Sequence, residues 1–178
     1  MSSPLSQSLR RRFAKIKLLL TDVDGILTDA AVYMNHDEES KRFCVMDGLG
    51  LRLFREQGHQ VGWISGRSSP ATQQRARECG IDFLYQGPGN KVVAAEAMLA
   101  QSGASWEEVC YMGDDVVDLG VLRRAGAAVT VPHAAPEAKA LAHYVTKTAG
   151  GHGAVREVIE LILKAQHQWA KLIEQYSA

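Results

Sequence analysis

Short apolar runs alternate with amphipathic stretches along most of the chain. The runs contain few polar residues, which is typical of strands that are buried on both faces of a parallel sheet. The expected strands are residues 16–21, 61–65, 83–85, 109–112, 127–131 and 144–145.

Most stretches between these runs space their apolar residues three and four apart, which predicts helices. One of them opens with Ser69 as an N-cap and Pro70 in the first turn, and it ends before Gly80. The expected helices are residues 47–57, 69–79, 90–102, 116–124 and about 154–176. Strands that alternate with helices predict an α/β fold with a Rossmann-like parallel sheet flanked by helices.

One segment interrupts this alternation. Residues 31–34 and 41–45 are strand-like, and the polar residues 35–40 separate them. Alternation with a period of two around a polar turn predicts a β-hairpin over about 31–45, inserted after the first strand.

The length of 178 residues fits one ordinary α/β domain. Residues 1–14 are Ser-rich and basic, and we expect them to form a flexible leader before a single domain over 15–178. The last helix would be roughly 30 Å long, which is more than a small sheet can cover. Its far end is therefore expected to pack on another subunit.

Composition narrows the class of protein. The 20 Lys and Arg residues balance the 20 Asp and Glu residues, which argues against nucleic acid as the main partner. No apolar run approaches the ~20 residues of a transmembrane helix or forms a signal-peptide core. We therefore expect a cytoplasmic protein without a membrane partner.

The three cysteines Cys44, Cys79 and Cys110 are widely spaced and odd in number. This argues against a disulfide framework or a zinc site.

Acidic residues follow two of the expected strands. Asp22 and Asp24 come after the first, and Asp114 and Asp115 come after the fourth, with Asp118 one helical turn later. Ligands of an open parallel sheet bind beyond the carboxyl ends of its strands. A solvated turn explains either cluster alone. Two acidic strand ends together favour a site for Mg²⁺, which prefers carboxylate oxygens.

Two further strand ends carry groups that suit a phosphate. Ser65, Gly66 and Arg67 offer a hydroxyl, a backbone amide and a guanidinium, although Ser65 alone could be a plain N-cap. Lys91 opposes the dipole of the helix that it begins, which a bound phosphate or simple exposure to solvent would explain. Together with the acids, these groups are what phosphoryl transfer through an aspartyl phosphate requires.

The segments DVDGILTD, ISGR, NK and GDDVVDL resemble, in this order, the four motifs of the haloacid dehalogenase superfamily of phosphatases. The resemblance implies that Asp22 is the nucleophile and Asp24 the general acid and base. It also implies that Ser65 and Lys91 bind the phosphoryl group.

The same resemblance implies a Mg²⁺ site. Its ligands would be Asp22, the backbone carbonyl of Asp24, and Asp114, with Asp115 and Asp118 as supporting acids.

Only the short hairpin is inserted after the first motif, so the chain resembles the capless branch of the superfamily. The segments from Phe43 to Arg52, LYQG–NK and AGGHGAVREV look like those of members that hydrolyse an eight-carbon sugar-acid phosphate in lipopolysaccharide precursor synthesis. Such members are homotetramers in which a neighbouring subunit helps to complete each site. This likeness implies substrate contacts at Asp24, Asp47, Gly48, Arg52, Arg67, Arg75 and Lys91.

Other readings stay open at this point. Cys44, Val45 and Met46 stand where these members commonly have polar or basic residues, and Met46 cannot donate a hydrogen bond to a sugar acid. A sialic-acid-like 9-phosphate is therefore an alternative substrate. A catalytically silent regulatory homologue and a signalling protein similar to response regulators are alternatives to an enzyme.

The run Gly150 to Gly153 could cradle a phosphate, because it precedes a helix. It lacks the residues of a nucleotide P-loop, so a tight turn before the last helix is the simpler interpretation, with His152 incidental.

Overall fold

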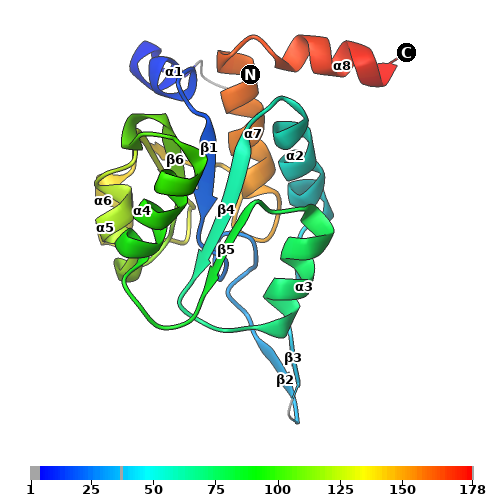
Figure 1. The fold of residues 1–178 in the computed structure, drawn as a ribbon, viewed down its shortest axis with the longest axis vertical. Coiled ribbons are helices and arrows are strands. Elements are labelled where there is room, and N and C mark those ends of the chain that lie inside the picture. The colour runs from blue at the N-terminus through cyan, green and yellow to red at the C-terminus, as the bar shows by residue number, and fades with distance from the viewer. Residues whose placement is uncertain (1–4, 37, 178) are drawn as a thin grey trace.

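The structure, a computed structural model, describes residues 5–36 and 38–177. Six parallel strands form one sheet in the order β5-β4-β1-β6-β7-β8 (Figure 1). They are β1 (Leu18–Thr21), β4 (Gln60–Ser65), β5 (Phe83–Gln86), β6 (Val109–Met112), β7 (Ala127–Thr130) and β8 (Tyr144–Val145). The sheet confirms the predicted parallel α/β architecture, and each expected strand is present with its ends shifted by at most two residues.

Helices cover both faces of this sheet, which is why β1, β6 and β7 are buried along their whole lengths. Helices α2, α3 and α7 lie on one face, and α4, α5 and α6 lie on the other (Figure 1). The helices are α1 (Gln7–Phe13), α2 (Val45–Glu56), α3 (Pro70–Cys79), α4 (Lys91–Ser102), α5 (Leu119–Leu122), α6 (Pro136–Leu141), α7 (Ala154–Ala165) and α8 (Trp169–Ser177), with 3-10 turns η1 (Trp106–Glu108) and η2 (Val116–Asp118). Within the described residues, none of these helices has the length and apolar character needed to cross a bilayer.

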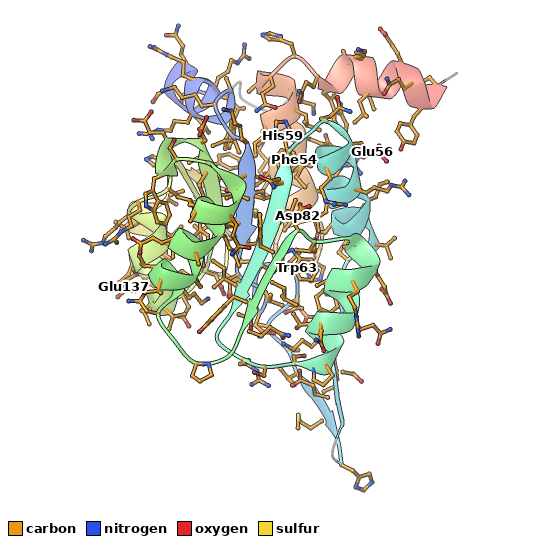
Figure 2. All side chains as sticks on the ribbon, in the orientation of Figure 1. Phe54, Glu56, His59, Trp63, Asp82 and Glu137 are labelled. Carbon is orange, nitrogen blue, oxygen red and sulfur yellow. The ribbon has the colours of Figure 1, made fainter. Side chains whose placement is uncertain are left out.

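The core lies between the sheet and the helices. Trp63 on β4 is fully buried, and Phe54 on α2 stacks on His59 with 4.4 Å between ring centroids (Figure 2). Capping follows the sequence signals: the Ser69 hydroxyl accepts a hydrogen bond from the Thr72 amide, and Gly80 ends α3 in the left-handed conformation.

A β-hairpin extends from the carboxyl edge of the sheet, as expected, but its second strand lies elsewhere (Figure 1). Strand β2 (Tyr33–Asn35) pairs antiparallel with β3 (Glu38–Ser40), in the stretch expected to be a turn. The expected strand over 41–45 is wrong, because Phe43 leaves the hairpin to stack on Trp63 at 6.2 Å and Val45 begins α2. No separate cap domain is inserted within the described residues.

The expectation of a flexible leader is also wrong for the described part of residues 1–14. Helix α1 begins at a Ser6 cap, and its Leu9 and Phe13 are buried. These two residues are four apart on one helix face, and Phe13 packs edge-on against Tyr144. Residues 1–4 lie outside the described residues.

The expected single helix over about 154–176 is two helices. Helix α7 ends at Ala165, His167 adopts a left-handed φ of 61°, and α8 then crosses the end of the molecule (Figure 1). The Gln168 amide donates to the Leu163 carbonyl at 2.9 Å, which satisfies an end group of α7. The turn lets Leu172 on α8 bury its side chain on the same subunit.

Candidate active site

The two acidic clusters meet at the carboxyl edge of the sheet. Strands β1 and β6 are neighbours, and the Asp22 amide donates to the Met112 carbonyl at 2.8 Å. Carboxylate oxygens of Asp22, Asp114 and Asp118 lie within 4.8 Å of one another. The convergence expected from the sequence is therefore present.

Lys91, the first residue of α4, joins this cluster as a buried cation. Its Nζ donates to Asp22 Oδ1 at 2.8 Å and to Asp118 Oδ1 at 2.7 Å. Burial lowers the pKa of Lys91, but the charges of Asp22 and Asp118 outweigh it and leave that pKa above its ordinary value. The lysine is thus charged and points at the acids, not at solvent.

Asp118 is fully buried and anchors the cluster. Besides Lys91, it accepts hydrogen bonds from the Tyr111 hydroxyl at 2.5 Å and from the backbone amides of Asp114 and Asp115, both at 3.1 Å. Tyr111 was not singled out from the sequence, although a tyrosine inside an otherwise apolar strand before Gly-Asp-Asp was an available signal. Asp115 turns outward and caps η2 through the Val116 amide.

The burial and hydrogen bonding of Asp22 and Asp114 favour a bound cation at this cluster. Burial raises the pKa of Asp22 to about 6, with Lys91 opposing the change. Burial also raises the pKa of Asp114 to about 7, and the charges of Asp22 and Asp118 add to the effect. Asp114 Oδ1 is buried without a hydrogen-bond partner. A hard divalent ion would supply the missing partner and the missing positive charge.

Two glycines let the backbone approach these acids. A Cβ on Gly25, whose φ is +99°, would lie 2.1 Å from Asp114 Oδ2, and a Cβ on Gly150 would lie 1.8 Å from the Gly25 carbonyl oxygen. The run Gly150 to Gly153 is a turn that packs under the loop after β1 and leads into α7. In it, His152 contacts Arg42 at 2.9 Å, and Arg42 pairs with Asp29 at 3.0 Å.

Residues of the hairpin border Asp24 and Ser65. Lys41 Nζ lies 2.7 Å from Asp24 Oδ1, and Glu39 pairs with Arg67 at 2.9 Å. Ser65 is buried at the end of β4, where its hydroxyl accepts from the Arg67 amide at 3.2 Å. Neither Lys41 nor Glu39 was singled out from the sequence, because nothing local distinguishes them from other hairpin charges.

Asp47 is a buried helix cap in this structure. Its Oδ1 accepts from the Arg156 amide in the first turn of α7 at 2.7 Å. Burial raises the pKa of Asp47 to about 6, against the opposing effect of backbone amides that include Arg156.

Three other residues expected to contact substrate lie apart from the acidic cluster. Gly48, Arg52 and Arg75 line a cavity of about 570 Å³ between α2 and α3, and no residue of the cluster lines it among those described. Arg52 pairs with Glu56, and Arg75 pairs with Glu78.

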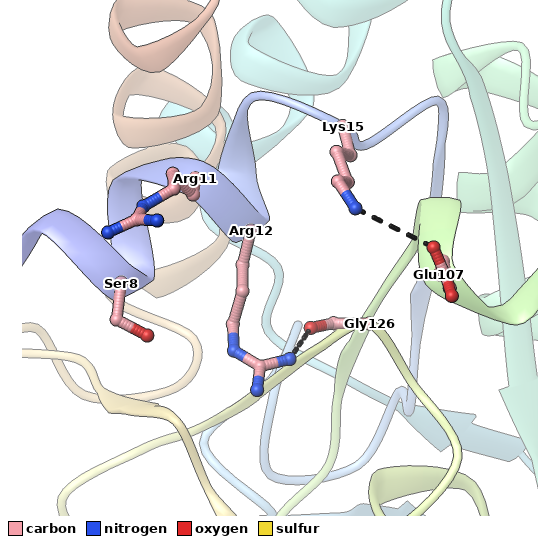
Figure 3. A pocket seen from close by; sticks show the side chains of 6 residues that line it. All are labelled: Ser8, Arg11, Arg12, Lys15, Glu107 and Gly126. Atoms are coloured by element: carbon pink, nitrogen blue, oxygen red, sulfur yellow. Dashed lines mark hydrogen bonds and ion pairs between the residues drawn. The ribbon is translucent and has the colours of Figure 1, made fainter.

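A further cavity, of about 490 Å³, lies at the opposite edge of the sheet (Figure 3). Two of its basic side chains are already engaged, because Arg12 donates to the Gly126 carbonyl at 2.6 Å and Lys15 pairs with Glu107 at 3.6 Å. The carboxyl edge therefore remains the place where the chemistry-bearing residues gather.

Known proteins are similar to this chain in sequence and in fold. A family profile described as haloacid dehalogenase-like hydrolase matches residues 83–159. The chain is 43% identical to 3-deoxy-D-manno-octulosonate 8-phosphate phosphatase KdsC of Yersinia pestis over 92% of this chain and 88% of that protein. It is 42% identical to the protein of that name from Escherichia coli K12, over 92% and 87%.

Solved structures of phosphatases with the same substrate in their names are also similar to this chain. The 3-deoxy-D-manno-octulosonate 8-phosphate phosphatase of Moraxella catarrhalis, in complex with magnesium ion, phosphate ion and KDO, is 38% identical with a TM-score of 0.93, covering 97% of this chain and 99% of that one. The cobalt-bound phosphatase of Haemophilus influenzae is 34% identical with a TM-score of 0.87, covering 92% and 99%.

Proposed function

The chain belongs to the 3-deoxy-D-manno-octulosonate 8-phosphate phosphatase family of haloacid dehalogenase-like hydrolases, and on that premise we propose that it hydrolyses this sugar-acid phosphate to 3-deoxy-D-manno-octulosonate and phosphate. The observation that carries the proposal is the buried Lys91 between Asp22 and Asp118, at the strand end next to Ser65. This arrangement supports phosphoryl transfer, which needs a nucleophilic carboxylate together with cationic and hydroxyl groups for the phosphoryl oxygens.

The reaction has two halves. A carboxylate oxygen of Asp22 attacks phosphorus, the bond from phosphorus to the sugar oxygen breaks, and Asp24 gives its proton to that oxygen. Water then attacks the phosphorus of the aspartyl phosphate, its proton passes to Asp24, and the bond to Asp22 breaks. Lys91 and the Ser65 hydroxyl hold the phosphoryl oxygens during both halves.

The metal of this site would be Mg²⁺, held by Asp22, the backbone carbonyl of Asp24, and Asp114. When bound, it neutralises the repulsion between the carboxylates and the phosphate. Asp118 is less available to the ion, because both of its oxygens already accept hydrogen bonds.

Replacing the nucleophile tests the proposal. Asp22→Asn removes the attacking carboxylate, so phosphate release from 3-deoxy-D-manno-octulosonate 8-phosphate is expected to fall by roughly 10³-fold or more. EDTA is expected to abolish turnover by the unaltered protein, and Mg²⁺ to restore it. Glu137→Gln, at an exposed site on α6 (Figure 2), is the matched carboxyl-to-amide control and is expected to keep full activity. Full activity of Asp22→Asn, or turnover without metal, contradicts the mechanism.

We also propose that the chain acts as a homotetramer in which a neighbouring subunit completes the site. Two features support the assembly: the hairpin exposes Tyr33 and Met34, and Val45 at the start of α2 is 78% exposed. The separation of Arg52 and Arg75 from the acids of their own subunit agrees with a role in a neighbour's site.

Met46 is the reason to test a second substrate. Its exposed thioether cannot donate a hydrogen bond to a sugar acid, so a sialic-acid-like 9-phosphate belongs in the same substrate panel. A cytoplasmic location stays a prediction, supported by three free cysteines.

A further inference from the structure

Lys41 is a buried lysine at the end of the hairpin, and neither half of the proposed reaction uses it. The Lys41 side chain is 0% exposed, and its ammonium lies 2.7 Å from Asp24 Oδ1. It also donates to Thr72 Oγ1 at 3.3 Å and lies 3.8 Å from Glu39 Oε1. Burying an ammonium is costly unless charged partners compensate it. The hairpin therefore supplies a fixed cation to the carboxylate that exchanges the proton.

The surroundings hold Lys41 from two directions. It directly follows β3, whose Glu39 is tied to Arg67 after β4, and Thr72 belongs to the first turn of α3. The ammonium thus links the hairpin and α3 to the loop after β1. A side chain anchored in this way can fix the position of the group that it touches.

The contact engages one end of the Asp24 carboxylate. Oδ1 is buried, and its close contact with the ammonium is an ion pair. The Asp24 side chain as a whole is 20% exposed, so its accessible surface lies away from Oδ1. This leaves Oδ2 as the oxygen that can reach a leaving group.

We propose that Lys41 is the positioning residue for Asp24: it holds Oδ1 so that Oδ2 faces the oxygen of the leaving group. The inference rests on the proposed function and deepens it. A general acid must stand within hydrogen-bond reach of the atom it protonates, and small displacements cost much of its effect. In this role Lys41 acts on the substrate only through Asp24.

The test measures how strongly turnover depends on the leaving group. Aryl phosphates from 4-nitrophenyl to phenyl phosphate carry the same phosphoryl group and differ in the basicity of the leaving phenolate. Loss of the more basic phenolate depends more strongly on the proton of Asp24. The value of kcat/KM covers only the steps through loss of the leaving group. Lys41→Met removes the ammonium at similar volume, and we expect kcat/KM to fall roughly 10²-fold for phenyl phosphate but less than about 5-fold for 4-nitrophenyl phosphate.

Several variants make the comparison decisive. The quantity to compare is the slope of kcat/KM against the basicity of the leaving phenolate. Asp24→Asn gives this slope for a site without the acid. Lys139→Met, at an exposed position on α6, is the matched control and is expected to keep the slope of the unaltered protein. If Lys41→Met does not fold by circular dichroism, Thr72→Val removes one anchor of the ammonium and is expected to steepen the slope to a smaller degree.

The outcomes separate the inference from the function. An equal loss for all aryl phosphates, or no loss, overturns the positioning role and leaves Lys41 as a structural ion pair. Absence of Mg²⁺-dependent turnover by the unaltered protein would instead defeat the proposed function.

Discussion

At the scale of single residues, the acidic edge of the sheet depends on groups that hold Asp118. This carboxylate is fully buried and accepts from Lys91, from Tyr111 and from two backbone amides. A buried charge is tolerated only when hydrogen bonds replace its lost hydration. Asp118 thereby orients Lys91 toward Asp22 without facing solvent itself.

Tyr111→Phe tests this support. The change removes the hydroxyl that donates to Asp118 Oδ1 and leaves a buried charge with one donor fewer. We expect the free energy of unfolding to fall by about 1–3 kcal/mol, measured by urea denaturation. Tyr176→Phe removes an exposed hydroxyl that donates to Glu56 at 3.3 Å, and as the control it is expected to change stability by less than about 0.5 kcal/mol. Equal effects of the two changes would argue against the anchoring role.

At the scale of elements, α2 and α7 are joined beneath the loop after β1. Asp47 in the first turn of α2 caps the first turn of α7, and the preceding turn places Gly150 and Gly151 against residues 25–29. The two helices also share the most extensive helix–helix packing of the described residues. Asp47 thus contributes to the site by fixing the turn on which that loop rests.

Asp47→Ala tests the cap. Loss of the acceptor is expected to lower the free energy of unfolding by about 1–2 kcal/mol. The difference should depend on pH, because the folded-state pKa is about 6 and the ordinary value is 3.8. Between these values the folded protein binds a proton that the unfolded chain does not, so the stability from Asp47 is full below pH 3.8 and falls as pH rises to about 6. Denaturation of both proteins across this window measures the trend, and a difference that grows with pH would contradict it.

At the scale of the whole molecule, exposed apolar side chains gather on the hairpin and the start of α2. Tyr33 is 56% exposed, Met34 69% and Met46 56%. A projecting two-stranded hairpin is at best marginally stable alone in water, so packing on another chain would stabilise it.

Light scattering tests this assembly. The unaltered protein is expected to have the mass of a tetramer, and Tyr33→Glu with Met34→Glu is expected to yield smaller species because charge would be buried at the contact. Val93→Glu, at an exposed apolar position on α4, is the control expected to keep the tetramer. An active monomer of the unaltered protein would refute a site completed by a neighbour.

The sequence by itself determined the parallel sheet and the meeting of the acids. Buried parallel strands need continuous apolar runs, and the carboxyl ends of such strands share one edge, so Asp22 and Asp114 had to be neighbours once β1 and β6 paired. Lys91 was predicted at the same edge as a phosphoryl-binding group, and the structure adds its contacts with Asp22 and Asp118. These features follow from local pattern and from topology.

The tertiary structure alone decided how other side chains are used. Phe43 packs on Trp63 and ends the hairpin early, His167 breaks the last helix, and α1 is ordered by burying Phe13. Lys41 beside Asp24 and Asp47 beneath α7 depend on contacts between segments far apart in the chain. Because the energies of burial and pairing arise only when such segments meet, the local pattern of a hairpin lysine or a helix aspartate contains no sign of them.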